Sequence, residues 1–144
     1  MRWLVLMALL WIGCGFVQDL ESRGPRLREP EWSDTDFVLD SIACALERKL
    51  GAASEETIMR FELREAEPDY PLREYVDTGR VPPMIILRGD QPSAIRTPLR
   101  HAVFAHLVPR FLEGDWNQMH SARWRPIEDE LNRIAGACRL EAQR

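Results

Sequence analysis

Apolar side chains recur every three or four residues from Val38 to Leu50, which predicts an amphipathic helix with one face in a core. Ser33 or Asp34 can cap the start of this helix, because short polar side chains accept hydrogen bonds from its first backbone N–H groups. Gly51 supplies the stop, since glycine readily adopts the backbone conformation that closes a helix. The folded domain is therefore expected to begin near Ser33.

Two strands are expected after this helix. From Met59 to Arg64, apolar and charged residues alternate, which places one side of a strand against a core and leaves the other in water. Residues 84–87 are apolar throughout and predict a short, more fully buried strand. Residues 65–82 carry several prolines and charges, and they predict a loop with one helical turn around Leu72 to Val76.

Two further helices complete the predicted domain. Thr97-Pro98 opens the first, because proline is tolerated at the first helical position, and Pro109 should end or kink it. No strongly polar face exists between Ala102 and Val108, so this helix should be buried on most sides. Pro126 opens the last helix, whose inward-facing positions are Ile127, Leu131, Ile134 and Cys138. Residues 33–144 thus predict a single α+β domain, with a small antiparallel sheet packed against three main helices.

Composition and charge exclude some functions. The chain has 144 residues, of which 45% are hydrophobic and 29% are charged, and this suits one compact domain rather than two. The formal net charge is -4, with acidic and basic residues interspersed. Because no broad positive field is available to hold phosphates, we expect no nucleic-acid partner.

The first 17 residues have the features of an export signal. Met1-Arg2 supplies a positive charge, and residues 3–12 form an uncharged apolar run that is too short to span a bilayer comfortably. The sequence Ile12-Gly13-Cys14 resembles the lipobox of bacterial lipoproteins, although Trp11 stands where that family usually has leucine. The resemblance implies that Cys14 is lipidated and holds the protein to membrane lipid. Ordinary signal cleavage and an uncleaved membrane anchor are the alternatives.

The next segment and the two remaining cysteines fit an exported protein. Residues 18–32 are polar, charged and interrupted by proline and glycine, and they predict a flexible tether between the signal and the domain. If Cys14 carries lipid, Cys44 and Cys138 remain as one candidate disulfide in an oxidising compartment. The alternative is two ordinary buried thiols.

All three histidines of the chain, His101, His106 and His120, fall in one short stretch. Neutral imidazole is the commonest protein ligand for zinc, and a catalytic zinc site typically takes three protein ligands. The cluster therefore predicts a candidate zinc site. The alternative gives each histidine a separate structural role, with His106 in the core, His101 on a helix surface and His120 beside the last helix.

The spacing of His101 and His106 restricts the zinc hypothesis. In a regular α-helix, residues four apart lie close together on one face, whereas residues five apart diverge by roughly 140° around the axis. The two side chains therefore cannot bind one ion from a regular helix. A π-bulge, which adds one residue to a turn and recurs at functional sites, would restore their alignment.

A strand, a buried helix with paired histidines, Gly114-Asp115 and a third histidine resemble the small zincin metallopeptidases, whose signature is His-Glu-x-x-His with a later ligand. The resemblance covers roughly Met84 to Trp124 and implies a zincin-like fold. Ala102 stands where that family has its glutamate general base, and the second histidine comes one residue late. Since a carboxylate normally relays the proton of the attacking water, a catalytically degenerate relative is expected, and no catalytic residue is identified.

Together these features predict an exported, membrane-anchored protein of the cell envelope, on the periplasmic side or at the outer membrane, or a secreted protein. Its domain would bind a partner protein or support an envelope assembly, with no cofactor required. The alternative is a zinc-dependent hydrolase or peptidase that uses His101, His106 and His120.

Overall fold

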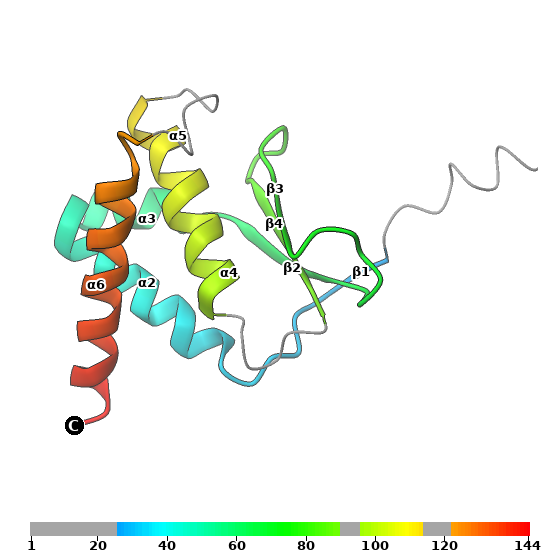
Figure 1. Cartoon of the computed structure of the whole chain (residues 1–144), viewed down its shortest axis with the longest axis horizontal. Coiled ribbons are helices and arrows are strands. Elements are labelled where there is room, and N and C mark those ends of the chain that lie inside the picture. Colours follow the sequence, from blue (N-terminus) through cyan, green and yellow to red (C-terminus); the bar gives the residue numbers. More distant parts are fainter. Residues whose placement is uncertain (1–25, 90–95, 114–121) are drawn as a thin grey trace, which may run out of the picture.

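Helices and a sheet form two layers in the computed structural model, which describes residues 26–89, 96–113 and 122–144. Three helices, α2 (Thr35–Leu50), α4 (Arg96–His101) and α6 (Arg125–Ala142), lie on one side of a four-stranded sheet (Figure 1). Their buried apolar side chains pack against Ile85 and Leu87 in one core. The expected α+β domain, with a small sheet packed against helices, is confirmed.

The sheet is mixed rather than purely antiparallel. Its strands lie in the order β1-β2-β4-β3, and their bounds are β1 (Leu27–Arg28), β2 (Glu62–Ala66), β3 (Glu74–Asp77) and β4 (Met84–Arg88). The outer pairs, β1 with β2 and β3 with β4, are antiparallel, whereas β2 and β4, which lie where the sequence predicted its two strands, are parallel. The chain reverses direction twice between β2 and β4, because β3 forms in between and takes the outer position.

The first helix follows the sequence pattern closely. α2 (Thr35–Leu50) begins after Asp34 and ends at Gly51, whose φ of 91° lies in the left-handed region that glycine tolerates. Of its predicted apolar face, Val38, Ile42 and Leu46 are buried, and Leu39 and Leu50 are partly buried against the same core. A short helix that the pattern did not predict, α3 (Ala52–Ile58), then leads into β2.

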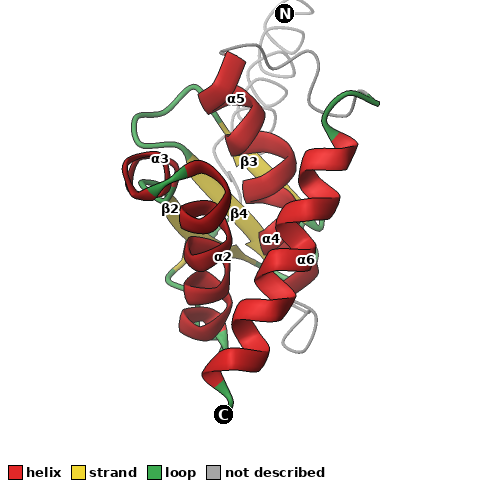
Figure 2. Ribbon diagram, turned by 90° about the vertical axis from the view of Figure 1, so that its left-hand side faces the viewer, coloured by secondary structure: helices red, strands yellow, loops and turns green. Residues whose placement is uncertain are grey.

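A continuous helix lies between the sheet and α6 (Arg125–Ala142), as Figures 1 and 2 show. It consists of α4 (Arg96–His101), the π-helical segment η1 (Ala102–Leu107) and α5 (Val108–Glu113). Every residue of η1 except His106 is buried, which confirms the predicted burial on most sides.

The helix does not end at Pro109, although an α-helix there would need the N–H that proline lacks. The backbone widens just before this residue instead, and the Val108 N–H donates to the Val103 carbonyl, five residues back. In a regular α-helix the proline ring would clash with the carbonyl four residues back, that of Ala105, and a wider turn is one way to relieve such a clash. The proline is therefore accommodated by widening rather than by termination.

The segment between β2 and β4 differs from the sequence prediction. β3 occupies residues 74–77, so the helical turn predicted around Leu72 to Val76 is wrong. Period-two alternation in this strand packs Val76 against the core and leaves Tyr75 44% exposed. Hydrogen bonding to the edge of β4 decides the conformation here, because the local pattern alone was too short and too polar to do so.

The N-terminal end of the described chain is fastened to the sheet. β1 pairs with β2, and Arg28 forms an ion pair with Glu65, which is buried. The same carboxylate accepts a hydrogen bond of 3.2 Å from the backbone N–H of Glu31, and Trp32 is also buried. The folded domain thus starts upstream of Ser33. Complementary charges on β2 hold a polar segment that composition alone assigned to the tether.

Residues 1–25, which include the predicted signal and the candidate lipidation site Cys14, lie outside the described residues. Among the helices of the described residues, none has both the length and the apolar character needed to cross a membrane. The signal, the lipidation and the export of the chain therefore stay predictions from the sequence.

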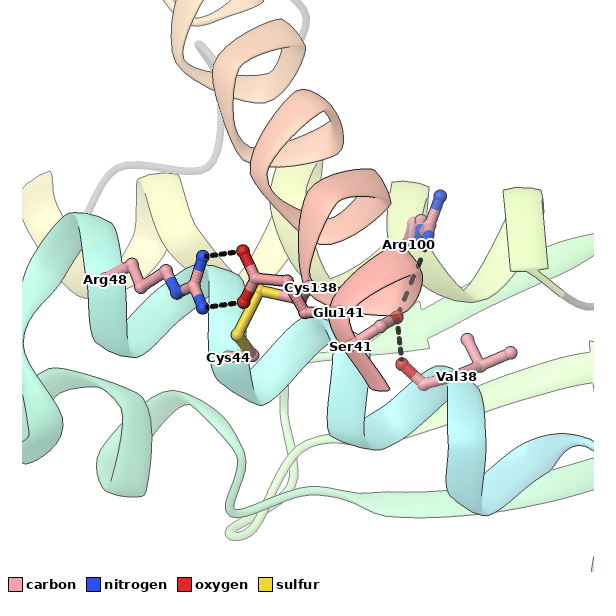
Figure 3. Close-up of a disulfide and its surroundings, with 7 residues drawn as sticks. All are labelled: Val38, Ser41, Cys44, Arg48, Arg100, Cys138 and Glu141. Atoms are coloured by element: carbon pink, nitrogen blue, oxygen red, sulfur yellow. Dashed lines mark hydrogen bonds and ion pairs between the residues drawn. A yellow bond between two sulfur atoms is a disulfide. The ribbon is translucent and has the colours of Figure 1, made fainter. Parts of the chain in front are cut away.

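A disulfide between Cys44 and Cys138 joins α2 to α6 (Figure 3). The two cysteines are 94 residues apart in the sequence, and their Cα atoms are 6.4 Å apart. About one helical turn beyond each cysteine, Arg48 donates to both carboxylate oxygens of Glu141, at 3.3 and 2.5 Å. Of the two alternatives that the sequence left open, the structure contains the disulfide.

Candidate metal centre

The π-helical segment brings His101 and His106 together. His101 ends α4 and His106 lies near the end of η1. Their ring centroids are 5.3 Å apart, and the ring planes meet at 85°. A regular α-helix would turn side chains with this spacing roughly 140° apart, so the extra residue in the π-turn is what aligns them. The two histidines therefore have the alignment that one shared metal ion would require.

Glu74 of β3 completes a group of three. Glu74, His101 and His106 each offer one ligand atom, and these atoms all lie within 4.8 Å of one another. The Oε1 atom of Glu74 is 3.3 Å from Nε2 of His101. All three side chains are partly buried, at the boundary between the sheet and the helical layer. These residues could hold a metal ion.

A second carboxylate orients His101 from the opposite side. Oε1 of Glu128, in the first turn of α6, lies 2.8 Å from Nδ1 of His101. Because an ionised carboxylate only accepts hydrogen bonds, this contact places a proton on Nδ1. In the neutral ring, the lone pair of Nε2 then points toward Glu74. Two acceptor atoms 3.3 Å apart repel each other unless a proton or a cation lies between them.

The electrostatics of Glu74 also favour a proton or a cation beside its carboxyl group. Burial raises the pKa of the Glu74 carboxyl to about 7, while His101 lowers it and nearby Glu128 raises it. The Oε2 atom of Glu74 is buried and has no hydrogen-bond partner within the described part of the chain. Burying a carboxylate without a partner is costly. A bound cation would offset this cost, as would a proton.

The sequence found only part of this group. His101 and His106 converge as the zinc hypothesis required, whereas the third predicted ligand, His120, lies outside the described residues. Glu74 was missed because its segment resembled a loop with a helical turn. Its alternation with Tyr75 and Val76 was the available signal, since that pattern also fits a short strand.

The residue after His101 in the sequence, where zincins have their glutamate general base, is an alanine. This residue, Ala102, is fully buried in the core. The carboxylates near His101 come instead from other elements, Glu74 from β3 and Glu128 from α6. No protein-family model, no curated protein and no solved structure matches this chain. The resemblance to zincins therefore stays a prediction.

Proposed function

We propose that this chain is an exported protein whose domain binds one zinc ion through Glu74, His101 and His106. The observation that carries the proposal is the approach of these three side chains to one centre. Imidazole and carboxylate ligands suit zinc. Glu128 adds the carboxylate that commonly stands behind a zinc-binding histidine, where it fixes the tautomer and raises the basicity of the ring.

The distances fit a tetrahedral ion. Ligand atoms about 2.0–2.1 Å from a tetrahedral zinc lie about 3.3 Å from one another. The separation of 3.3 Å between Oε1 of Glu74 and Nε2 of His101 already has this value. His106 can complete the set by small side-chain shifts, because all the ligand atoms lie within 4.8 Å.

The ion would join the two layers of the domain. Glu74 belongs to the sheet, whereas His101 and His106 belong to the helix that packs on it. We propose a non-catalytic role in which zinc fixes this joint, so that the domain presents a constant surface to a partner protein in the cell envelope. The absence of a glutamate at position 102 favours this role over catalysis, since Ala102 cannot move a proton.

A zinc-dependent hydrolase is the second candidate. The number of ligands favours it, because catalytic zinc sites typically use three protein ligands and keep a fourth position for water. A fluorogenic peptide mixture tests this candidate. Hydrolysis by the zinc-loaded wild type that is abolished in H106A would favour the hydrolase over the non-catalytic role.

Isothermal titration of the full-length chain with zinc tests the site. We expect one zinc per chain in the wild type, and an affinity lower by at least about 100-fold in E74Q or H106A, since each variant removes a ligand. E141Q is the matched control, because Glu141 is an exposed carboxylate on α6 outside the group. Failure of the wild type to bind zinc at micromolar concentrations would overturn the proposal.

The H120A variant separates the two possible ligand sets. If His120 is a fourth ligand, H120A should weaken zinc binding as strongly as H106A does. An unchanged affinity in H120A leaves Glu74, His101 and His106 as the complete protein ligand set. Loss of binding in H120A together with full binding in E74Q would replace Glu74 by His120.

We also propose that Cys14 anchors the exported chain to a membrane. The lipobox resemblance supports the anchor, and the disulfide between Cys44 and Cys138 supports an oxidising compartment. Labelling of producing bacterial cells with radioactive palmitate should mark the wild type in the membrane fraction and leave C14S unlabelled. Unlabelled wild-type protein in the culture medium would instead indicate ordinary signal cleavage and secretion.

A further inference from the structure

A second candidate site lies on the surface beside α3, α5 and the loop before β4. It is a pocket of about 240 Å³. Its floor includes Ile58 and Leu107, which are buried, and its rim includes Val81 and Phe111. No residue of this pocket belongs to the candidate metal centre.

The rim of the pocket exposes large apolar side chains. Val81 is 95% exposed and Phe111 is 41% exposed. Single exposed apolar residues are common on protein surfaces. Here two of them lie beside the buried apolar side chains of Ile58 and Leu107, so the pocket offers a small apolar contact surface. The volume is below the usual range of 300–1,000 Å³ for sites that enclose a small-molecule ligand. The pocket therefore suits an inserted side chain of a larger partner.

Three arginines also line the pocket, namely Arg60, Arg80 and Arg110. Arg110 is held in place by a 3.0 Å hydrogen bond from its Nη1 to the carbonyl of Thr78. Arg60 and Arg80 are exposed at the surface, and Arg80 also lies 3.8 Å from a carboxylate oxygen of Glu62, so a partner's carboxylate would share or replace that contact. Because the whole chain has a net charge of -4, three guanidinium groups around one pocket form a local positive region. Guanidinium groups bind carboxylates through paired hydrogen bonds.

We propose that this pocket binds an acidic peptide segment of a partner protein, which inserts an aliphatic or aromatic side chain onto Ile58 and Leu107. Carboxylates on both sides of that side chain would meet Arg60 and Arg80. Charge complementarity selects this occupant, since the arginines would repel a basic segment and leave a neutral one without ionic contacts. The proposal does not depend on zinc, because the two sites share no residue.

Fluorescence polarisation with the full-length chain tests the proposal. The probe is a fluorescein-labelled peptide with a central Leu-Phe pair flanked by glutamates and aspartates. We expect saturable binding that weakens with salt, and a loss of at least about tenfold in the R60E/R80E double variant. R133E, which reverses an exposed arginine on α6, is the matched control and should bind normally. Absence of binding by the wild type, or an equal loss in R133E, would overturn the proposal.

Further measurements test the apolar contact and distinguish peptide binding from membrane binding and from an effect of the zinc centre. V81S changes a side chain that is almost fully exposed, so it should fold normally and bind the peptide more weakly. A probe with Ser-Ser in place of Leu-Phe should also bind weakly, and equal binding of both probes would reduce the site to a charge effect. Binding to phosphatidylglycerol vesicles without binding to the peptide would assign the pocket to a membrane. E74Q should bind the peptide normally, which separates this site from the zinc centre.

Discussion

His101 is the residue on which the candidate metal centre is built. Its two ring nitrogens face carboxylates from two different elements, Glu128 at 2.8 Å and Glu74 at 3.3 Å. One contact fixes the tautomer and the other turns the remaining nitrogen toward the centre. A histidine in a merely structural role needs one such partner, whereas this arrangement requires a shared proton or a cation.

Glu128 is predicted to be a positioning residue rather than a ligand. E128Q removes its charge but keeps its shape, so the Nδ1 contact weakens while the packing is retained. We expect zinc affinity to fall by about 10- to 100-fold, with little change in the melting temperature of the metal-free protein. Titration calorimetry and thermal melts in chelator measure the two quantities. A large drop in melting temperature with unchanged zinc affinity would assign Glu128 to stability alone.

Because of Glu74, we predict that the stability of the metal-free protein depends on pH. Its folded-state pKa of about 7 lies above the ordinary value of 4.5, mainly because of burial, with opposing contributions from His101 and Glu128. The folded state therefore binds the Glu74 proton more tightly, and the associated stability is lost as the pH rises from about 4.5 through 7. E74Q stays neutral, so its melting temperature in chelator should rise relative to the wild type across this window.

E141Q is a control for which the change in stability with pH is expected to have the opposite sign. The hydrogen bond from Arg48, and secondarily its charge, lower the pKa of Glu141, so that the stability from this pair is present above pH 4.5 and absent in strong acid. E141Q should therefore lose stability relative to the wild type as the pH rises. If the melting temperatures of E74Q and E141Q, each relative to the wild type, changed with pH in the same way, the burial of Glu74 would not explain the pH dependence.

At the scale of elements, the π-helical segment decides whether the histidines can act together. The sequence contained two signals for it: a spacing of five between the histidines, and Pro109 within an otherwise helical pattern. Neither signal selects a π-turn by itself, because proline is equally compatible with a kink or an end. The packing of η1 between the sheet and α6 keeps the helix continuous. Pro109 is then accommodated by a wider helical turn rather than by a kink or an end.

Replacing Pro109 tests this link between backbone and site. P109A supplies an N–H that can donate to the Ala105 carbonyl and removes the ring that would meet it, so regular α-helical hydrogen bonding becomes available. Such a helix would turn His101 and His106 apart, and we expect zinc affinity to fall at least about tenfold. P126A, at the start of α6 where proline removes no helical bond, should bind zinc normally. Equal affinities in P109A and the wild type would show that Pro109 does not maintain the π-turn.

At the scale of the whole molecule, the disulfide between Cys44 and Cys138 connects the first and last long helices. These helices already pack against each other in the core, so the covalent bond restrains mainly the unfolded chain. The sequence could propose this pairing only by counting cysteines, because 94 residues separate the two.

Removing the disulfide should therefore destabilise the fold without changing it. For C44S/C138S we expect a decrease of about 2–4 kcal/mol in the free energy of unfolding, measured by urea denaturation. C14S, which removes the cysteine outside the pair, should leave this free energy unchanged. Identical unfolding curves for the wild type under oxidising and reducing conditions would argue against the bond.

The sequence by itself determined the elements whose signals are local. The helix after Asp34, the buried run of β4 and the last helix all have a hydrophobic period and end signals that suffice to predict them. The tertiary structure decided what depends on distant partners: the strand at residues 74–77, the order of the sheet, and the meeting of Glu74 and Glu128 with His101. A short polar segment has no strong conformational preference of its own, so it takes the one that pairing and ionic contacts supply, and no local pattern records those contacts.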